Sequence, residues 1–312
     1  MRASRTTVGL RHSIRFLAHR RSAEGYVREV ALRRWLVLAL GCLLLSAAGC
    51  SGPFASAAPP TLTVQGSGAV VDLQPWSYCW GKVCADGVPP QSLPSVGAGD
   101  RVRVSSSDTG LSLSAQFLAA EEECSRIQYV PLGTVGKQLS LWPAGPAGTY
   151  DVLLHVEGSQ GHSASYGFRW TTTRDGVWPV PAASASVLAD NNGTTTSYGV
   201  EVRVENMATT PQQASATIEV TSAEGRTTTI RPQRVESGEG CGPPGSLTFQ
   251  APETAAQAVI ASGSVPFRYE VRLVLDGQIY RGAAIWPNDQ QPGTHPSVRL
   301  HFRPALPALP QR

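Results

Sequence analysis

From residue 61 onwards the sequence consists of short segments in which apolar and polar residues alternate, separated by Gly, Pro, Asn and Asp. Leu111–Phe117 and Val152–Val156 are examples of this alternation. Because successive side chains of a β-strand point to opposite faces, a period of two predicts strands with one buried face each. Only Pro252–Ser262 has a helical composition. Many short, closely spaced strands predict an all-β sandwich or barrel.

The alternating pattern occupies two stretches, 61–172 and 183–303. Residues 173–182 between them have the composition of a linker. Since residues 51–312 leave room for about two domains of ordinary size, we expect one antiparallel β-sandwich in each stretch. Gly148-Thr149-Tyr150, at the start of a predicted strand, resembles the tyrosine corner of immunoglobulin-like sandwiches. The resemblance implies an immunoglobulin-like fold. Counting the alternating runs gives about seven to nine strands in the first stretch.

Local patterns in the second stretch predict particular strands. Val200–Glu205 has one apolar and one charged face, as in an antiparallel sheet with one wet side. Asp276-Gly277 stands between two alternating runs, which predicts a two-residue hairpin. Val298–Arg303 is predicted to be the last strand, and the proline-rich residues 304–312 to be a disordered tail.

Residues 1–50 have the features of an export signal. An arginine-rich flank precedes the apolar run Trp35–Gly49, which is shorter than the about 20 residues of a membrane-spanning helix. Ala47-Ala48-Gly49-Cys50 resembles the lipobox of bacterial lipoproteins, although Ala47 stands where that class prefers Leu. The resemblance implies cleavage before Cys50, lipidation of its thiol, and residues 51–60 as a tether. Ordinary secretion, with cleavage after Ala55-Ser56-Ala57, is the alternative.

The charge of the chain is divided unevenly between these parts. Residues 1–50 carry nine Arg and two Glu, so residues 51–312 have a net charge of −4 although the whole chain is +3. No basic stripe of the kind that nucleic-acid binding requires is present, which excludes that class of partner. Only two of the 26 basic residues are Lys, which indicates a GC-rich genome, such as that of an actinobacterium.

Four cysteines remain in the exported part: Cys79, Cys84, Cys124 and Cys241. An even number in an exported chain predicts disulfides, for which three connectivities exist. Cys79 and Cys84 are close enough in sequence for a local bridge, and Cys124 and Cys241 would then pair or stay free. The spacings of zinc-binding and thioredoxin-like motifs are absent.

The sequence contains no motif of a hydrolase, metalloprotease, P-loop or dinucleotide-binding enzyme, so we predict no enzyme, catalytic residue or cofactor. His155 and His162 flank a predicted turn and would suit a metal. However, a register in which Val152, Leu154 and Val156 face residues 164, 166 and 168 places the two histidines on opposite faces. We therefore predict no metal site there.

The segment around Trp76, Tyr78 and Trp80 combines three aromatic residues with the Cys79–Cys84 loop. Tryptophan and tyrosine are good anchors at interfaces, which makes this segment a candidate recognition surface. The alternative is structural, with the disulfide and a tryptophan closing the end of a sandwich.

These features together predict a lipid-anchored binding or structural protein at the outer face of the cell membrane, in the bacterial envelope. The expected partners are the membrane, through the lipid, and an envelope protein or glycan. The alternative is an extracytoplasmic metal-handling protein or enzyme whose site is assembled from residues distant in sequence.

Overall fold

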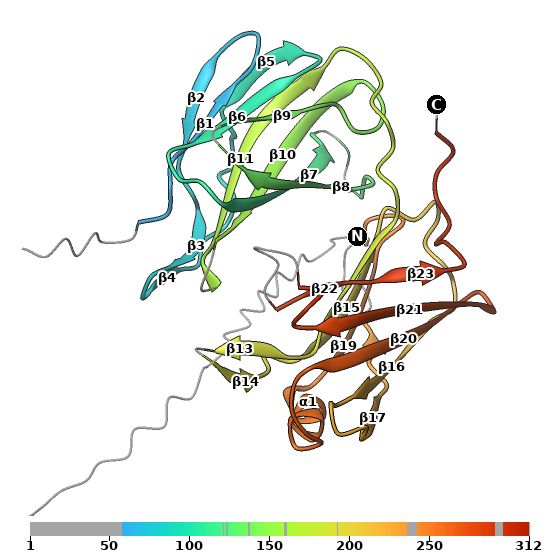
Figure 1. Ribbon diagram of the computed structural model, residues 1–312. Helices are drawn as coiled ribbons and strands as arrows, with labels where there is room; N and C mark the ends of the chain where they lie inside the picture. Colours follow the sequence, from blue (N-terminus) through green and yellow to red (C-terminus); the bar gives the residue numbers. More distant parts are fainter. Residues whose placement is uncertain are drawn as a thin grey trace, which may run out of the picture. The chain divides into compact units, whose positions relative to one another are not determined.

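The computed structural model describes residues 58–311 apart from 121, 123, 137, 159–160, 192, 236–241 and 291–295 (Figure 1). These residues belong to one compact unit, Phe54–Arg312. Cys50 and the rest of the predicted signal peptide lie outside the described residues. No helix within the described part has the length and apolar character needed to cross a membrane.

The first sandwich consists of two sheets around a core of its own. In strand order, one sheet is β2-β1-β6-β9 and the other is β4-β3-β11-β10-β7-β8, with β5 parallel to β11. Its strands in the described residues are β1 (Leu62–Gln65), β2 (Val70–Leu73), β3 (Ser77–Trp80), β4 (Val83–Ala85), β5 (Ser95–Gly99), β6 (Val102–Ser106), β7 (Leu111–Ala119), β8 (Gln128–Val135), β9 (Gln138–Leu141), β10 (Gly148–Glu157) and β11 (Ser163–Thr172).

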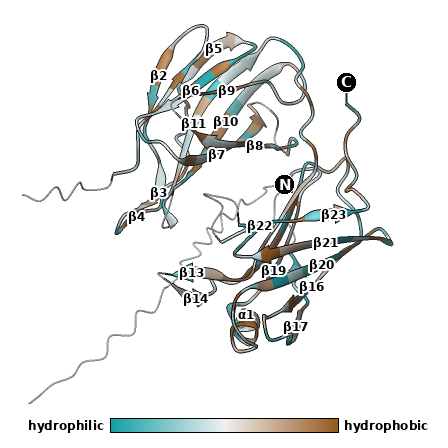
Figure 2. Ribbon diagram, viewed as in Figure 1, coloured by the Kyte–Doolittle hydropathy of each residue, from teal (hydrophilic) through white to brown (hydrophobic). Residues whose placement is uncertain are grey.

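The second sandwich has its own two sheets, β18-β19-β15-β12-β22 and β17-β16-β20-β21-β23. Figure 2 shows both brown and teal residues along its long strands, as expected where one face is buried. Its elements are β12 (Ala182–Ser186), β13 (Ala189–Asn191), β14 (Thr194–Thr196), β15 (Val200–Glu205), β16 (Ala214–Thr221), β17 (Thr227–Ile230), β18 (Gln233–Arg234), β19 (Leu247–Ala251), α1 (Glu253–Ile260), β20 (Phe267–Leu275), β21 (Gln278–Trp286), β22 (Val298–Arg299) and β23 (His301–Arg303).

The strand order makes both sandwiches immunoglobulin-like. Labelled A to G in the usual way, β1, β6 and β9 follow the order A-B-E, and β8, β7, β10 and β11 follow C′-C-F-G. In the second sandwich β12, β15, β19 and β18 follow A-B-E-D, and β17, β16, β20 and β21 follow C′-C-F-G. The all-β, immunoglobulin-like fold expected from the sequence is therefore confirmed.

The register of the long strands agrees with the alternation in the sequence. Val152 faces Phe168, Leu154 faces Tyr166 and Val156 faces Ala164 across β10 and β11, which confirms the predicted pairing. Asp276 and Gly277 connect β20 to β21 with φ angles of 47° and 85°. Two positive φ angles are typical of the type I′ turn expected for this hairpin.

Tyr150 confirms the predicted tyrosine corner. Its hydroxyl donates a hydrogen bond of 2.6 Å to the carbonyl of Pro146, and the side chain is only 4% exposed. This bond ties the loop before β10 to the strand itself.

Replacing Tyr150 by Phe is expected to reduce the free energy of unfolding by about 1 kcal/mol, because it removes the hydrogen bond that the hydroxyl of the buried tyrosine donates to the Pro146 carbonyl. The free energy is obtained from urea-induced unfolding. Tyr198→Phe is the matched control, since Tyr198 is 70% exposed and should give no measurable change. Equal stability of the Tyr150 variant and the wild type would show that the corner does not stabilise the fold.

The end of the chain differs from expectation in two respects. Val298–Arg303 is not one strand. Its first part, β22, pairs with β12, and Leu300 donates its N–H to the carbonyl of Ala183. The chain then passes to the other sheet, where β23 pairs with β21. The predicted disordered tail instead packs against the second sandwich. Leu306 is 9% exposed within its core, and Ala208 donates its N–H to the carbonyl of Pro307.

The first stretch also contains more strands than expected, because a short insertion (β2, β3 and β4) precedes β5. The second sandwich begins at Ala182, the last residue of the predicted linker, since Ala182 already pairs with Glu205. The expected helix is present as α1, whose Ala256 and Val259 are buried in the second core.

The side chains of Asn206 and Arg126 connect the sandwiches. The Asn206 amide accepts a hydrogen bond of 3.0 Å from the N–H of Tyr129 and donates one of 2.7 Å to the carbonyl of the same residue. Arg126 donates from its guanidinium to the carbonyls of Met207 and Ala208, at 2.5 and 2.7 Å. In this way the turn after β15 binds to the start of β8.

Candidate functional site

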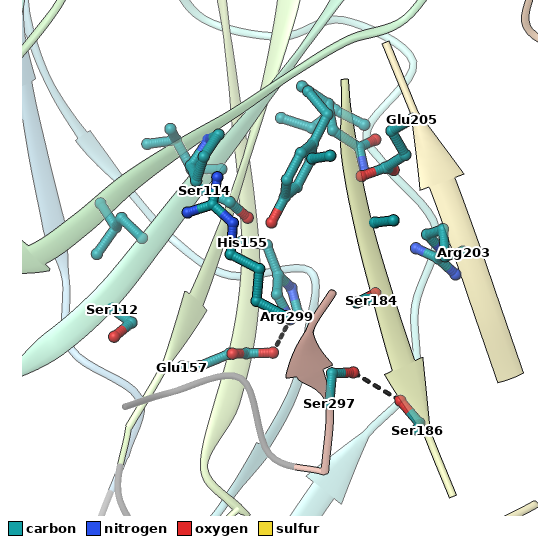
Figure 3. Close-up of a pocket in the computed structure, with 18 of the residues that line it drawn as sticks. Ser112, Ser114, His155, Glu157, Ser184, Ser186, Arg203, Glu205, Ser297 and Arg299 are labelled. Atoms are coloured by element: carbon teal, nitrogen blue, oxygen red, sulfur yellow. Dashed lines mark hydrogen bonds and ion pairs between the residues drawn. The ribbon is translucent and has the colours of Figure 1, made fainter. Parts of the chain in front are cut away.

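A cavity of about 530 Å³ lies between the outer faces of β7, β8, β10 and β11 and those of β12, β15 and β22. Figure 3 shows it, and we call it the inter-sandwich cleft. Its volume lies within the usual range for small-molecule sites. The labelled side chains are hydroxyls, carboxylates, guanidinium groups and an imidazole, and apolar residues such as Trp76 and Leu153 complete the lining.

The wall from the first sandwich follows from strand alternation. On β7 Ser112, Ser114 and Gln116 point outward because Leu113, Ala115 and Phe117 point into the core. These outward residues continue across the sheet by register, so that Ser114 lies opposite His155, and His155 lies opposite Ser165.

His155 is held within this wall by polar neighbours. Its Nδ1 lies 3.3 Å from the hydroxyl of Ser165, and its Nε2 lies 3.2 Å from a carboxylate oxygen of Glu157. Both ring nitrogens thus have partners on the same face of the sheet, which fixes the plane of the imidazole.

The wall from the second sandwich carries the positive charge. Ser184 of β12 lies opposite Arg203 of β15 on one side and opposite Arg299 of β22 on the other. Neighbouring strands are about 5 Å apart, so this row places one arginine on each side of the Ser184 hydroxyl. Arg203 forms an ion pair of 3.1 Å with Glu201.

Arg299 is the charged residue of this row for which the described part of the chain provides no partner. It makes no hydrogen bond or ion pair with any residue that the structure describes, and it lies between the two walls in Figure 3. Ser186 and Ser297, near the mouth, form a hydrogen bond of 2.6 Å with each other.

Glu205 lies two residues beyond Arg203 on the same face of β15. Burial raises the pKa of the Glu205 carboxyl to about 7, nearby Arg203 opposes the shift, and Glu201 adds to it. Burial also raises the pKa of Tyr129 on the opposite wall, and the carboxylates of Glu205 and Glu157 act in the same direction. The inner end of the cleft therefore contains a carboxyl that can be protonated near neutral pH.

We expect Glu205 to make stability depend on pH. Between its ordinary value of 4.5 and about 7, the folded chain keeps a proton that the unfolded chain has lost, so stability falls as the pH rises through this window. Above the window the whole penalty is present, about 2 to 3 kcal/mol. Glu205→Gln mimics the protonated acid and should remove this loss.

The test compares urea unfolding of the wild type and of Glu205→Gln at both ends of that window. Their difference in stability should be small at the acid end and should grow, in favour of the variant, at the alkaline end. Glu270→Gln, at an exposed position of β20, serves as the control. A constant difference between the wild type and Glu205→Gln would contradict the raised pKa.

The candidate recognition residues are divided between the cleft and the core. Trp76 lines the cleft, where its ring covers Gly167 so closely that a Cβ there would approach it to 3.0 Å. Tyr78 packs against the first core. Trp80 is 6% exposed and stacks on His162 with ring centroids 4.7 Å apart, so it closes the end of the sandwich and offers no surface.

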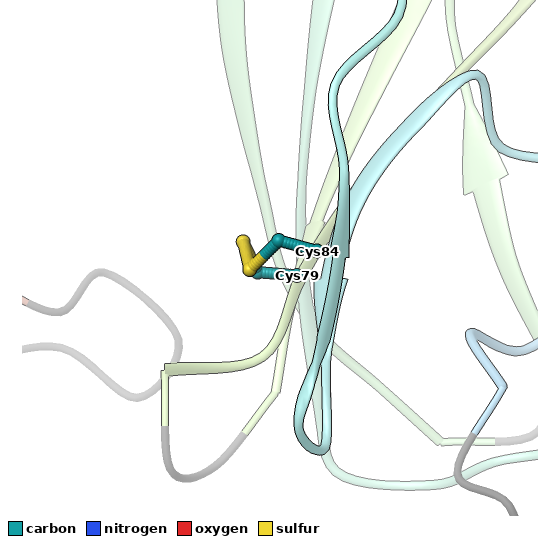
Figure 4. Close-up of a disulfide and its surroundings, with 2 residues drawn as sticks. All are labelled: Cys79 and Cys84. Atoms are coloured by element: carbon teal, nitrogen blue, oxygen red, sulfur yellow. A yellow bond between two sulfur atoms is a disulfide. The ribbon is translucent and has the colours of Figure 1, made fainter. Parts of the chain in front are cut away.

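The expected local disulfide is present. Cys79 and Cys84 lie directly opposite each other on β3 and β4 and are bonded (Figure 4). Cys124 is also disulfide-bonded. Cys241 lies outside the described residues, so its pairing with Cys124 stays a prediction.

His155 and His162 are separated as the register required. His155 lies in the cleft wall, whereas His162 stacks on Trp80. No group of three or more His, Cys, Asp or Glu side chains within the described residues could hold a metal ion.

The cleft itself was not predicted from the sequence. Its residues alternate with core residues, as the water-exposed face of any antiparallel strand does. The one available signal is Gly167, a glycine inside a strand, which often marks the close approach of another group.

Comparisons with known proteins define no family. No protein-family model and no curated protein matches the chain. Among solved structures, it is similar to the chicken CNTN1 FN1–FN3 domains, with 13% identity over 74% of this chain and 90% of that chain and a TM-score of 0.18. So low a score supports no conclusion, and the immunoglobulin-like class is defined by the strand order alone.

Proposed function

We propose that this chain is a lipid-anchored, extracytoplasmic binding protein of the bacterial envelope, whose ligand occupies the inter-sandwich cleft. The observation that carries the proposal is the cleft itself, whose lining combines polar and apolar side chains and includes Arg299, a guanidinium without a hydrogen-bond or ion-pair partner among the described residues. Small-molecule sites are concave and largely apolar, with a few polar groups that orient the ligand, and Arg299 would be such a group here.

Two features support a location outside the cytoplasm. The Cys79–Cys84 disulfide is typical of chains that fold in an oxidising compartment. The lipobox-like sequence that ends at Cys50 would attach the N-terminus to the membrane, and the few residues before β1 would act as the tether.

The anchor is tested by fractionating cells that express the wild type or Cys50→Ala. The wild type should sediment with membranes and carry a diacylglyceryl group, whereas the variant should stay unlipidated. Recovery of wild-type protein in the medium, without lipid, would instead support ordinary secretion.

The binding role is tested by placing a photo-crosslinking amino acid in the cleft of the full chain, at Gln116, in cells of the native host. The matched control carries the same group at Arg281, an exposed residue of the opposite sheet of the second sandwich. Capture of one reproducible species at Gln116 and not at Arg281 is expected. Identical products at both positions would contradict a ligand site in the cleft.

A further inference from the structure

The cleft also indicates what kind of ligand it accepts, and this inference rests on the proposed binding function. Arg203 forms an ion pair with Glu201, and Glu157 lies against the His155 ring, which is charged only when protonated. Arg299 is the lining guanidinium that makes no ion pair or hydrogen bond with any described residue, so its N–H groups can bind a ligand. A guanidinium in this position favours an anionic group.

The place of that group follows from the row Arg299, Ser184 and Arg203. A planar guanidinium can bind two oxygens of a carboxylate or phosphate at once, and the central hydroxyl can donate to the same group. Arg203 has N–H groups beyond the one paired with Glu201 and could donate a further hydrogen bond to the same group. The second wall thus offers one anion subsite centred on Ser184.

The remainder of the cleft is suited to hydroxyl groups. Ser112 and Ser114 of β7 and Ser165 of β11 bring hydroxyls to this wall, and a hydroxyl can act as both donor and acceptor. A protonated Glu205 can likewise donate and accept. A ligand that bears several hydroxyls could form further hydrogen bonds with these groups without introducing more charge.

Trp76 adds an aromatic platform at the β11 side of the cleft. An edge of its ring lies so close to Gly167 that a Cβ there would approach it to 3.0 Å, and Leu93 and Leu153 lie beside the same position. The negative face of an indole attracts the weakly positive C–H groups on the flat side of a pyranose ring. A polyhydroxylated ring therefore fits this surface better than an aliphatic chain.

We infer that the ligand of the inter-sandwich cleft is a short acidic saccharide. Its carboxylate or phosphate binds at Arg299 and Ser184, its hydroxyls bind the serines of the opposite wall, and one ring packs on Trp76. A cavity of about 530 Å³ has room for about two sugar rings.

The test is binding of the full chain to immobilised oligosaccharides that contain uronic acid, N-acetylmuramic acid or sugar phosphate, each with its neutral counterpart. The wild type should prefer an acidic member. Arg299→Gln should weaken that binding about tenfold or more and abolish the preference, since a charged hydrogen-bonded pair is worth at least that factor. Comparing the oligosaccharides that carry a carboxylate with those that carry a phosphate identifies which acidic group the cleft binds.

Two controls make the result decisive. Arg281→Gln removes an exposed arginine from the other sheet and should leave binding unchanged. Arg203→Gln provides a second cleft variant with a smaller expected loss, and unfolding curves show whether each variant folds.

Equal binding of acidic and neutral members, or acidic binding that survives Arg299→Gln and Arg203→Gln, would overturn the inference. Absence of saccharide binding, with another species captured at Gln116 in cells, would overturn the ligand class and leave the binding function standing. Absence of both saccharide binding and capture would overturn both.

Discussion

Trp170→Ala is expected to reduce the free energy of unfolding by about 3 to 5 kcal/mol. Trp170 is 1% exposed in the first core, next to Phe117 at a ring-centroid distance of 6.1 Å. It lies opposite Tyr150 on the neighbouring strand of the same sheet, and both side chains belong to the first core. Removing the indole would leave a cavity too enclosed for its neighbours to fill.

The loss is measured by urea unfolding, followed through far-ultraviolet circular dichroism because the substitution removes a fluorophore. Trp142→Ala is the matched control: Trp142 is 50% exposed and its ring lies against the guanidinium groups of Arg101 and Arg174, so its loss should cost less than about 1 kcal/mol. Similar losses for the two variants would contradict the described core.

Asn206→Ala is expected to cost about 3 kcal/mol, although it removes few atoms. The Asn206 side chain is 4% exposed, and it satisfies the N–H and carbonyl of Tyr129 and the carbonyl of Val180. Alanine leaves these groups without their partner. It must also adopt the φ angle of 62°, which asparagine tolerates better than alanine does.

Asn206→Gly separates the two contributions, because glycine adopts the same φ angle at little cost and still lacks the amide. The glycine variant should recover about 1 kcal/mol of the loss and no more. Full recovery would show that backbone strain alone explains the effect, and wild-type stability of the alanine variant would show that the amide does not connect the sandwiches.

Local sequence patterns correctly predicted the features that depend on residues close together in the chain. The hairpin at Asp276-Gly277 needs two positive φ angles, and the sequence offers residues that accept them. The pairing of β10 with β11 follows from matching the apolar face of Val152 and Leu154 to that of Tyr166 and Phe168. The Cys79–Cys84 bridge follows from proximity in the chain.

Features that depend on partners distant in sequence were missed. Val298–Arg303 alternates without interruption, so nothing in it marks Leu300 as the point where the chain changes sheets. The composition of residues 304–312 indicates disorder, but Leu306 has a place in the second core. Trp80 has the composition of an interface anchor and is buried against His162.

The all-β class, the two immunoglobulin-like sandwiches and the register of their main hairpins could be predicted from the sequence, because strand alternation and turn chemistry operate over a few residues. Which polar sheet faces lie opposite each other is visible in the tertiary structure alone. The outward residues of β7 and β15 have the pattern of solvated faces, and they become a cleft because Asn206 and Arg126 bind the two sandwiches together. Such long-range hydrogen bonds leave no periodic trace in a sequence.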